Sequence, residues 1–303
     1  MRRTLVWIAR VLLAVVALVV VGLGALWARS ERALRRSYAP SPAELTLDAP
    51  APDSAAVARG RHLATAIGTC TLCHGDDLGG ALYADAGPLG VIAGPNLTRG
   101  RGGRATPRST ADWVRAIRFG VRDDGRSLVV MPSEVYTHLS DHDLAALVAY
   151  LDRLPPVDRE PPRTRFGPVG RLMLGAGRLN LLVAPKTRRL AERAEPVPGP
   201  TAAYGRYLAD VAGCHGCHGY GLSGGRVAGP PGLPPASNLT PAGRLPSWSE
   251  GDFVRAMRTG TRPDGTRLDE FMPWRQLGRM TAEELRAIWL YLRSVPAKPF
   301  GSK

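Results

Sequence analysis

The chain of 303 residues contains four cysteines, and all four belong to two copies of one short motif, C-x-x-C-H. The copies are Cys70-Thr-Leu-Cys73-His74 and Cys214-His-Gly-Cys217-His218. On a helical turn, residues i, i+3 and i+4 share one face, so both sulfurs and the imidazole can meet one flat ring. This spacing is typical of covalent haem attachment, in which two thioether bonds hold the porphyrin and the histidine ligates the iron. The sequence therefore predicts two covalently bound haem c groups.

Two other interpretations of the cysteines are weaker. A single copy of the motif also fits a zinc site or a thiol redox site, but two copies without a spare cysteine favour haem. An even number of cysteines also fits a disulfide framework in an exported protein. Because thioether bonds leave no thiol free to pair, we expect no disulfide.

The first 28 residues have the composition of a membrane-spanning helix. The stretch from Val11 to Trp27 is unbroken by charge, and as a helix it rises roughly 26 Å, close to the minimum for a span. Arg10 lies near its end, where the side chain can reach the interface. No small-x-small cleavage site follows, since Leu26-Trp27-Ala28 begins with the wrong residue. We therefore expect an uncleaved anchor rather than a removed signal peptide.

The chain after the anchor is one unit written twice. The last element of each unit is a predicted amphipathic helix, Ser140–Leu154 in the first unit and Thr281–Val295 in the second. A proline ends each of these helices. The 35 glycines and 27 prolines indicate short helices joined by turn-rich loops. The segments that correspond are Arg59–Leu63 with Tyr204–Leu208, Asn96–Thr98 with Asn238–Thr240, Ser109–Arg118 with Ser249–Arg258, and Met131-Pro132 with Met272-Pro273.

These patterns predict an all-α fold, with an N-terminal transmembrane helix followed by two tandem haem domains. The stretch Phe166–Pro185, between the units, is apolar but too interrupted by glycine and arginine to span a membrane. It is either a linker packed across both units or a segment that docks on a membrane surface or a partner. The predicted boundaries are an anchor over 1–28, a linker over 29–54, a first unit over 55–156, an inter-domain linker over 157–200, a second unit over 201–298 and a tail over 299–303.

A methionine is expected on the far side of each iron. Met131 and Met272 are each followed by proline and lie at matching distances from the two motifs, whereas other methionines such as Met173 lack a counterpart in the repeat. A thioether ligand favours the reduced iron and raises its potential, which suits an electron carrier. We therefore expect His74 with Met131, and His218 with Met272, as axial pairs.

Further residues are candidates for supporting roles. A ligating imidazole needs its second nitrogen held, and the backbone carbonyls of Pro95 and Ser237 stand at matching positions to accept it. Arg115 and Arg255 match each other and either pair with a haem propionate or line a solvated helix face. His215, between two cysteines, is expected to point outward. No ligand role is assigned to the histidines without repeat partners, His62, His138, His142 and His215.

Each unit resembles a class I cytochrome c domain. The resemblance rests on Gly60 and Gly205 in the first helices, C-x-x-C-H, the loop that begins Gly94-Pro-Asn-Leu97, Met-Pro, and an aromatic residue in the last helices. It covers about residues 55 to 298. It implies that the first and last helices of each unit cross, with Gly60 near Tyr150 and Gly205 near Tyr291.

The tandem layout is similar to the membrane-bound cytochrome subunits of bacterial periplasmic alcohol and gluconate dehydrogenases. Those subunits usually carry three haem motifs, whereas this chain has two and an N-terminal anchor. The resemblance thus implies a cytochrome but leaves open which dehydrogenase complex, if any, it serves.

The charge balance points to the kind of partner. Lys and Arg outnumber Asp and Glu by 40 to 26, which suits anionic lipid headgroups or an acidic redox protein. The arginines are scattered and aromatic residues make up 6% of the chain, so we expect no nucleic-acid partner. The arginines after the span do not by themselves orient it. Haem attachment on the outer face of the bacterial inner membrane places the units in the periplasm.

We therefore expect an electron-transfer protein rather than an enzyme. It would carry single electrons from a dehydrogenase or quinol-linked donor to an oxidase or another cytochrome. The alternative is a haem enzyme, such as a di-haem peroxidase or a sulfur-compound oxidase, which needs an open iron position. A haem-based sensor is less favoured, because the chain has no recognisable output segment.

Overall fold

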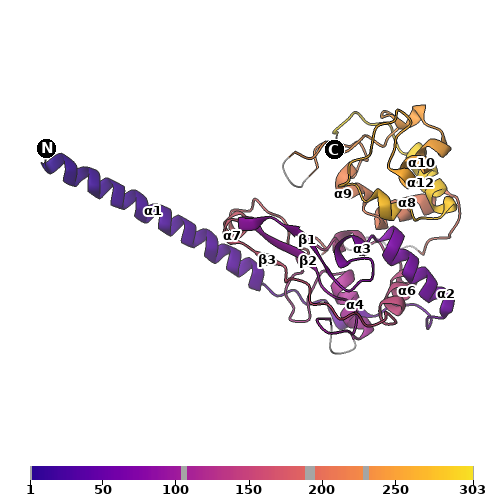
Figure 1. Cartoon of the computed structure of the whole chain (residues 1–303), viewed down its shortest axis with the longest axis horizontal. Helices are drawn as coiled ribbons and strands as arrows, with labels where there is room; N and C mark the ends of the chain where they lie inside the picture. Colours follow the sequence, from indigo (N-terminus) through magenta and orange to yellow (C-terminus); the bar gives the residue numbers. More distant parts are fainter. Residues whose placement is uncertain (1, 104–107, 188–194, 228–231, 303) are drawn as a thin grey trace.

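The computed structural model describes residues 2–103, 108–187, 195–227 and 232–302. A long helix, α1 (Arg2–Arg35), projects from a body of short helices (Figure 1). The helices of the first unit are α2 (Ser54–His62), α3 (Thr71–His74), α4 (Thr110–Ile117), α5 (Ser133–Tyr136) and α6 (Asp141–Leu151). Those of the second unit are α8 (Ala202–Val211), α9 (Cys214–His218), α10 (Glu250–Thr259), α11 (Trp274–Leu277) and α12 (Ala282–Ser294). Single-turn helices add η1 (Pro42–Leu45), η2 (Leu63–Ile67), η3 (Gly87–Leu89) and η4 (Leu245–Ser247).

The predicted all-α fold is wrong in one respect, because the first unit carries a small antiparallel sheet. Its strands lie in the order β1 (Ala81–Asp85), β2 (Gly90–Gly94) and β3 (Arg165–Phe166), with a bulge in β1. The tight turn at η3 reverses the chain, and the apolar Val91 and Ile92 favour an extended strand. The third strand comes from the segment between the units. The fold is thus mostly helical, with one hairpin extended by a distant strand.

Polar caps fix where the main helices begin. Ser109 and Asp112 form a capping box at α4, and Ser249 and Asp252 form the same box at α10. The side chain of Ser140 accepts a hydrogen bond from Asp143 N at the start of α6. The predicted starts of the last helices, at Ser140 and Thr281, are confirmed. Each cap satisfies backbone donors that the first helical turn leaves open.

The first and last helices of each unit cross at a glycine. A Cβ at Gly60 would collide with the carbonyl oxygen of Ala146 and would lie 2.9 Å from Tyr150 Cβ. A Cβ at Gly205 would collide with the carbonyl oxygen of Ala287, at the matching position of α12. The expected crossing is confirmed in both units, although Gly205 meets α12 about one turn before Tyr291.

The predicted apolar stripes of the last helices form the core. Leu144 and Leu285 are fully buried and belong to one hydrophobic cluster that continues through both units. All other members of the two stripes are buried as well, namely Leu147, Val148, Leu151, Ile288, Trp289 and Leu292.

The two units meet through equivalent residues in reciprocal pairs. His62 Nε2 lies 2.6 Å from Glu284 Oε2, and Tyr207 donates its hydroxyl hydrogen to Asp143 Oδ2 at 2.7 Å. In the repeat, His62 corresponds to Tyr207 and Asp143 corresponds to Glu284. Likewise α11 touches η2 while α5 touches α8. The contact therefore has the reciprocity of a two-fold interface, formed here within one chain.

The N-terminal helix α1 is longer than predicted and packs on the body. α1 continues to Arg35, seven residues beyond the predicted boundary at 28, and residues 2–25 are exposed. It is long and apolar enough to cross a membrane. Its last part packs against α7 (Pro168–Gly175), which lies in the segment between the units.

The same segment also completes the first unit. Val183 is buried and lies against Gly120, where a Cβ would come within 3 Å of Val183 Cβ. In the second unit the corresponding glycine, Gly260, is covered instead by the ring of Trp274, from within the unit. Among the described residues, this segment contacts the first unit and α1.

Candidate haem-attachment sites

Both C-x-x-C-H motifs form a helical turn, as their spacing predicts. Cys70 N-caps α3 in right-handed helical conformation, and α9 begins at Cys214. The residue before each motif, Thr69 or Gly213, has a positive φ that turns the chain into the helix. Burial raises the pKa of the Cys70 and Cys214 thiols to about 12. None of the four cysteines, all of which lie in the described part of the chain, is paired in a disulfide.

The imidazoles of both motifs are held by backbone carbonyls. His74 Nδ1 lies 2.9 Å from the carbonyl oxygen of Pro95, and His218 Nδ1 lies 2.8 Å from that of Ser237. A carbonyl only accepts, so Nδ1 carries the hydrogen and Nε2 keeps the lone pair that a metal needs. Burial lowers the pKa of both imidazoles, and the carbonyl contact offsets only part of this. The expected acceptors are confirmed.

The chain after each histidine follows the same path in the two units. Gly80 N donates to the carbonyl of His74 at 2.7 Å, and Gly224 N donates to that of His218 at 2.9 Å. Between them, Leu78 and Leu222 both have a φ of 56°, a strained value for leucine. The same strained turn in both units brings the loop back under its histidine.

An asparagine braces the carbonyl-bearing loop of each unit. Asn96 Oδ1 accepts from the amide and the hydroxyl of Thr98, at 2.9 and 2.8 Å, and its Nδ2 donates to Val157 O at 2.7 Å. Asn238 makes the same bonds with Thr240 and donates to Lys298 O at 2.8 Å. Each brace therefore ties the loop that holds the imidazole to the chain that follows the last helix.

The two Met-Pro pairs each form the same type of backbone turn. Ser133 N donates to Met131 O at 2.9 Å, and Trp274 N donates to Met272 O at 2.7 Å. Pro132 lies between, with φ −82° and ψ 54°, and the second proline has φ −77° and ψ 47°. These values define an inverse γ-turn centred on proline. The same turn thus sets the backbone beside both methionines.

Both methionines are half-buried against the hydrophobic core that Cys70 and Cys214 also contact. In the first unit a hydrogen bond links the methionine side to the motif, because the Tyr136 hydroxyl donates to the Gly68 carbonyl at 2.6 Å. Gly68 in turn lies beside the Cys70 sulfur. The structure therefore brings each predicted methionine onto the core that its motif borders.

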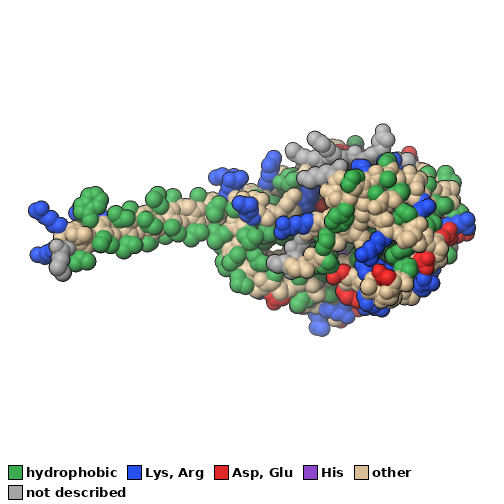
Figure 2. Space-filling view, turned by 90° about the horizontal axis from the view of Figure 1, so that it is seen from above, with side chains coloured by type: hydrophobic (Ala, Val, Ile, Leu, Met, Phe, Trp, Pro, Cys, Tyr) green, Lys and Arg blue, Asp and Glu red, His purple; other side chains and the backbone are tan. Residues whose placement is uncertain are grey.

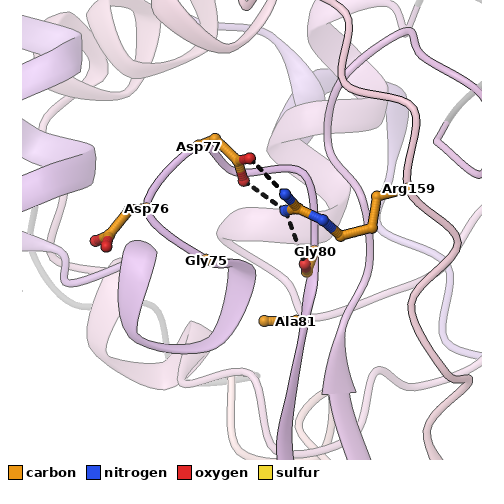
Figure 3. A pocket seen from close by; sticks show the side chains of 6 residues that line it. All are labelled: Gly75, Asp76, Asp77, Gly80, Ala81 and Arg159. Atoms are coloured by element: carbon orange, nitrogen blue, oxygen red, sulfur yellow. Dashed lines mark hydrogen bonds and ion pairs between the residues drawn. The ribbon is translucent and has the colours of Figure 1, made fainter.

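An ion pair pins the loop that follows the first motif. Arg159 forks onto Asp77 with contacts of 2.7 and 2.8 Å and also reaches the Gly80 carbonyl at 3.3 Å (Figure 3). These residues border a shallow hollow of about 450 Å³, which is also lined by Gly75, the residue after His74. Asp76 points away from this pair in Figure 3 and lies 3.9 Å from Arg279 of the second unit. The hollow is the outer side of the attachment loop.

The structure distinguishes between the roles open to the remaining candidate residues. Arg115 pairs with Asp112 at 2.6 Å, and Arg255 pairs with Asp252. These contacts favour the helix-face interpretation over a propionate contact. His215 does not point outward as expected, since its Nε2 lies 2.8 Å from Asp210 and the side chain is 18% exposed.

The sequence pattern did not point to Arg159 or Tyr136, because the second unit repeats neither side chain. Tyr136 corresponds to Leu277, which cannot donate a hydrogen bond. The pairing of Arg159 with Asp77 joins residues that are far apart in the chain. Only the folded structure shows these two contacts.

The chain is similar in sequence to known cytochromes. Residues 55–151 match the family of subunit III of cbb3-type cytochrome c oxidase. A diheme cytochrome c-type protein of Cereibacter sphaeroides is 31% identical over 261 residues, which cover 76% of this chain and 83% of that protein.

Subunits of dehydrogenases are similar as well. The fructose dehydrogenase cytochrome subunit of Gluconobacter japonicus is 30% identical over 275 residues, covering 82% of this chain and 55% of that protein. The gluconate 2-dehydrogenase cytochrome c subunit of Pantoea cypripedii is 31% identical over 283 residues, covering 81% and 61%. The chain thus spans little more than half the length of these subunits.

Proposed function

The chain belongs to the family of cytochromes c, which carry electrons, and we propose that it is a membrane-anchored di-haem member. It would pass single electrons at the periplasmic face of the inner membrane, from a dehydrogenase or quinol-linked donor to an oxidase or another cytochrome. One observation carries the proposal. The same motif helix, carbonyl-held imidazole and Met-Pro turn occur twice, once in each unit.

The residues of each unit fit a covalent haem. The cysteine pairs would form the thioether bonds, and the free Nε2 of each motif histidine would ligate the iron. Met131 and Met272 would take the opposite positions. A haem iron held in this way supplies one-electron redox chemistry.

The remaining residues hold this donor set in place. Because Pro95 and Ser237 fix the imidazole hydrogen on Nδ1, each ring keeps its orientation and gains basicity at Nε2. The Asn96 and Asn238 braces keep those carbonyls in position. Because both proposed iron ligands are side chains of the protein, a substrate would have no open site on the metal, which favours electron transfer over catalysis.

We further propose that the repeat units are two tandem class I cytochrome c domains, over 55–156 and 201–298. The glycine crossings at Gly60 and Gly205 support this, because each unit closes its own first and last helices on each other. The stretches 29–54 and 157–200 would be linkers and 299–303 a tail, although the second linker also packs on the first domain.

The contacts of α1 support a retained anchor over 1–28. Arg171 stacks 4.8 Å from the Trp27 ring and pairs with Glu31, and Ser30 is fully buried. A Cβ at Gly175 would collide with the Leu26 carbonyl. Removal of residues 1–28 would take Leu26 and Trp27 away from α7, so a fitted helix suits an anchor better than a discarded signal.

The similarity to dehydrogenase cytochrome subunits favours a dehydrogenase as the electron donor. The formal net charge of +14 suits an acidic partner surface. The direct test is a count of c-type haem by pyridine haemochrome, with two groups per chain expected. Pigment extracted by acid acetone, or fewer than two groups, would contradict the proposal.

The axial ligands are tested by redox titration of the full-length protein. Met131→Ala and Met272→Ala should each lower the potential of one haem and leave the other near its original value. Met173→Ala, which removes a methionine outside the repeat, is the matched control and should change neither. Carbon monoxide should bind the reduced variants but not the reduced wild type. Binding to the wild type would instead support a haem enzyme.

A further inference from the structure

One end of the body packs against α1 at the point where its exposed apolar stretch ends. α7 packs against Leu26 and Trp27, and the tip of the β1–β2 hairpin packs on α7, where a Cβ at Gly170 would collide with the Leu89 carbonyl. We call these three pieces the collar: residues 26–32 of α1, 85–90 at the hairpin tip, and 168–178 of α7 and the following turn. The three pieces of the collar pack together where the exposed apolar stretch of α1 ends.

The exposed surface of the collar is both apolar and cationic. Leu89 and Val169 are 41% and 42% exposed, and Trp27 is 45% exposed. In Figure 2, hydrophobic side chains cover α1 and continue over the adjoining end of the body, with Lys and Arg beside them. The exposed arginines 29, 32 and 178 have no carboxylate partner among the described residues.

We propose that the collar is a second membrane contact, seated on anionic phospholipid headgroups around α1. This inference rests on the proposed anchor. Tryptophan, apolar side chains and unpaired arginines together are typical of a surface at the lipid–water boundary. A lipid surface is the occupant that the position requires, because the collar is continuous with the helix proposed to cross the bilayer.

The collar also explains the arginines that follow the span. Arg29 and Arg32 would lie on the periplasmic side, where the positive-inside rule does not favour them. Headgroup contacts give these charges a role there, with an attraction that corresponds to about fivefold in affinity for each arginine, or about 1 kcal/mol. The seat would also hold the body in one orientation above the membrane.

Amide hydrogen exchange of the full-length, haem-loaded protein tests the seat directly. The protein is compared in nanodiscs of phosphatidylcholine, in nanodiscs that also contain phosphatidylglycerol, and in neutral detergent. Peptides covering 85–90 and 168–178 should exchange most slowly in the anionic nanodiscs, and added salt should reduce that difference. Equal exchange in all three environments would overturn the inference.

A charge variant provides a second arm. Arg178→Gln should speed exchange of the collar about fivefold in anionic nanodiscs and have little effect in phosphatidylcholine. Arg286→Gln, on α12, is the matched control and should change neither. Exchange in α6 and α12 reports whether the variants stay folded. Protection that appears only when dehydrogenase-containing membranes are added would show a protein partner instead and contradict the lipid seat.

The two proposals can fail separately. If the protein from membranes lacks residues 1–28 by intact mass, the anchor itself fails. If the full chain is retained and holds two haems, but amide hydrogen exchange in the collar does not depend on the lipid, only the proposed contact with headgroups fails.

Discussion

His62 and Glu284 lie in different repeat units, yet their side chains meet at 2.6 Å. Glu284 belongs to the capping box of α12, and its other oxygen receives Arg59 at 3.0 Å. Arg59 also forks onto Asp143 of its own unit. One carboxylate therefore joins the helix before the first motif to the helix that closes the second unit. These polar contacts join the two halves together with the hydrophobic cluster that continues through both units.

Replacing Glu284 should loosen this contact. Glu284→Gln leaves His62 without its carboxylate and Arg59 with Asp143 alone, and we expect a loss of about 1 to 3 kcal/mol in the free energy of unfolding. Glu283→Gln is the matched control, because Glu283 is exposed in the same helical turn and should cost little. Chemical denaturation of the haem-loaded protein measures both. Equal losses in the two variants would refute the assigned role.

The Glu284 carboxylate should make the free energy of unfolding depend on pH in the acid range. Burial alone would raise the pKa of Glu284, but the His62 contact, the Thr281 amide and Arg59 outweigh it and lower the pKa below 4.5. A group with a lowered folded pKa stabilises above its unfolded pKa, and that contribution disappears as the pH falls through the folded value. Wild type should therefore lose stability below about pH 4.5 more steeply than Glu284→Gln. Parallel curves from denaturation across this range would contradict the prediction.

The glycine crossings should not tolerate a methyl group. Gly60→Ala and Gly205→Ala each place a Cβ on a carbonyl oxygen of the facing helix, and we expect each to cost about 1 to 3 kcal/mol. Gly251→Ala, in the first turn of α10, has only an ordinary contact at 3.7 Å. It should be neutral or stabilise by up to about 1 kcal/mol. Thermal or chemical unfolding of the three variants checks the ranking.

Removal of either asparagine brace should weaken its unit. Asn96→Ala or Asn238→Ala leaves buried threonine donors and a backbone carbonyl without their partner, which costs about 1 to 3 kcal/mol. The loss should also disturb the carbonyl that holds the nearby imidazole, so the potential of that haem should shift. Asn180→Ala, at an exposed position, is the control. A stability change without any change in potential would separate the brace from the imidazole.

Local and repeated features could be read from the sequence. The caps at Ser109 and Thr281 follow from residue spacing alone, and the carbonyls of Pro95 and Ser237 follow from the repeat. Features that depend on distant partners could not. The sheet needs Phe166 to pair with Gly90, and no local pattern specifies that pairing.

The contact between the units could not be predicted from the sequence, for a related reason. His62 and Tyr207 occupy equivalent positions but differ in side chain, as do Asp143 and Glu284. The repeat therefore reveals no shared residue type at the interface, although the contacts are reciprocal. The path of Phe166–Pro185 was likewise undetermined, because its glycines and arginines fit several surfaces until α1 is seen beside it.

The cover over Gly120 has a consequence for the order of synthesis. Val183 reaches this glycine from beyond the end of α6, whereas Trp274 covers Gly260 from inside its own unit. A nascent chain emerging amino-terminus first thus completes all helices of its first half before the piece that caps that half has left the ribosome. The second half carries its cap within itself. The first unit therefore stays incomplete, with Gly120 uncovered, until the segment that carries Val183 has been synthesised.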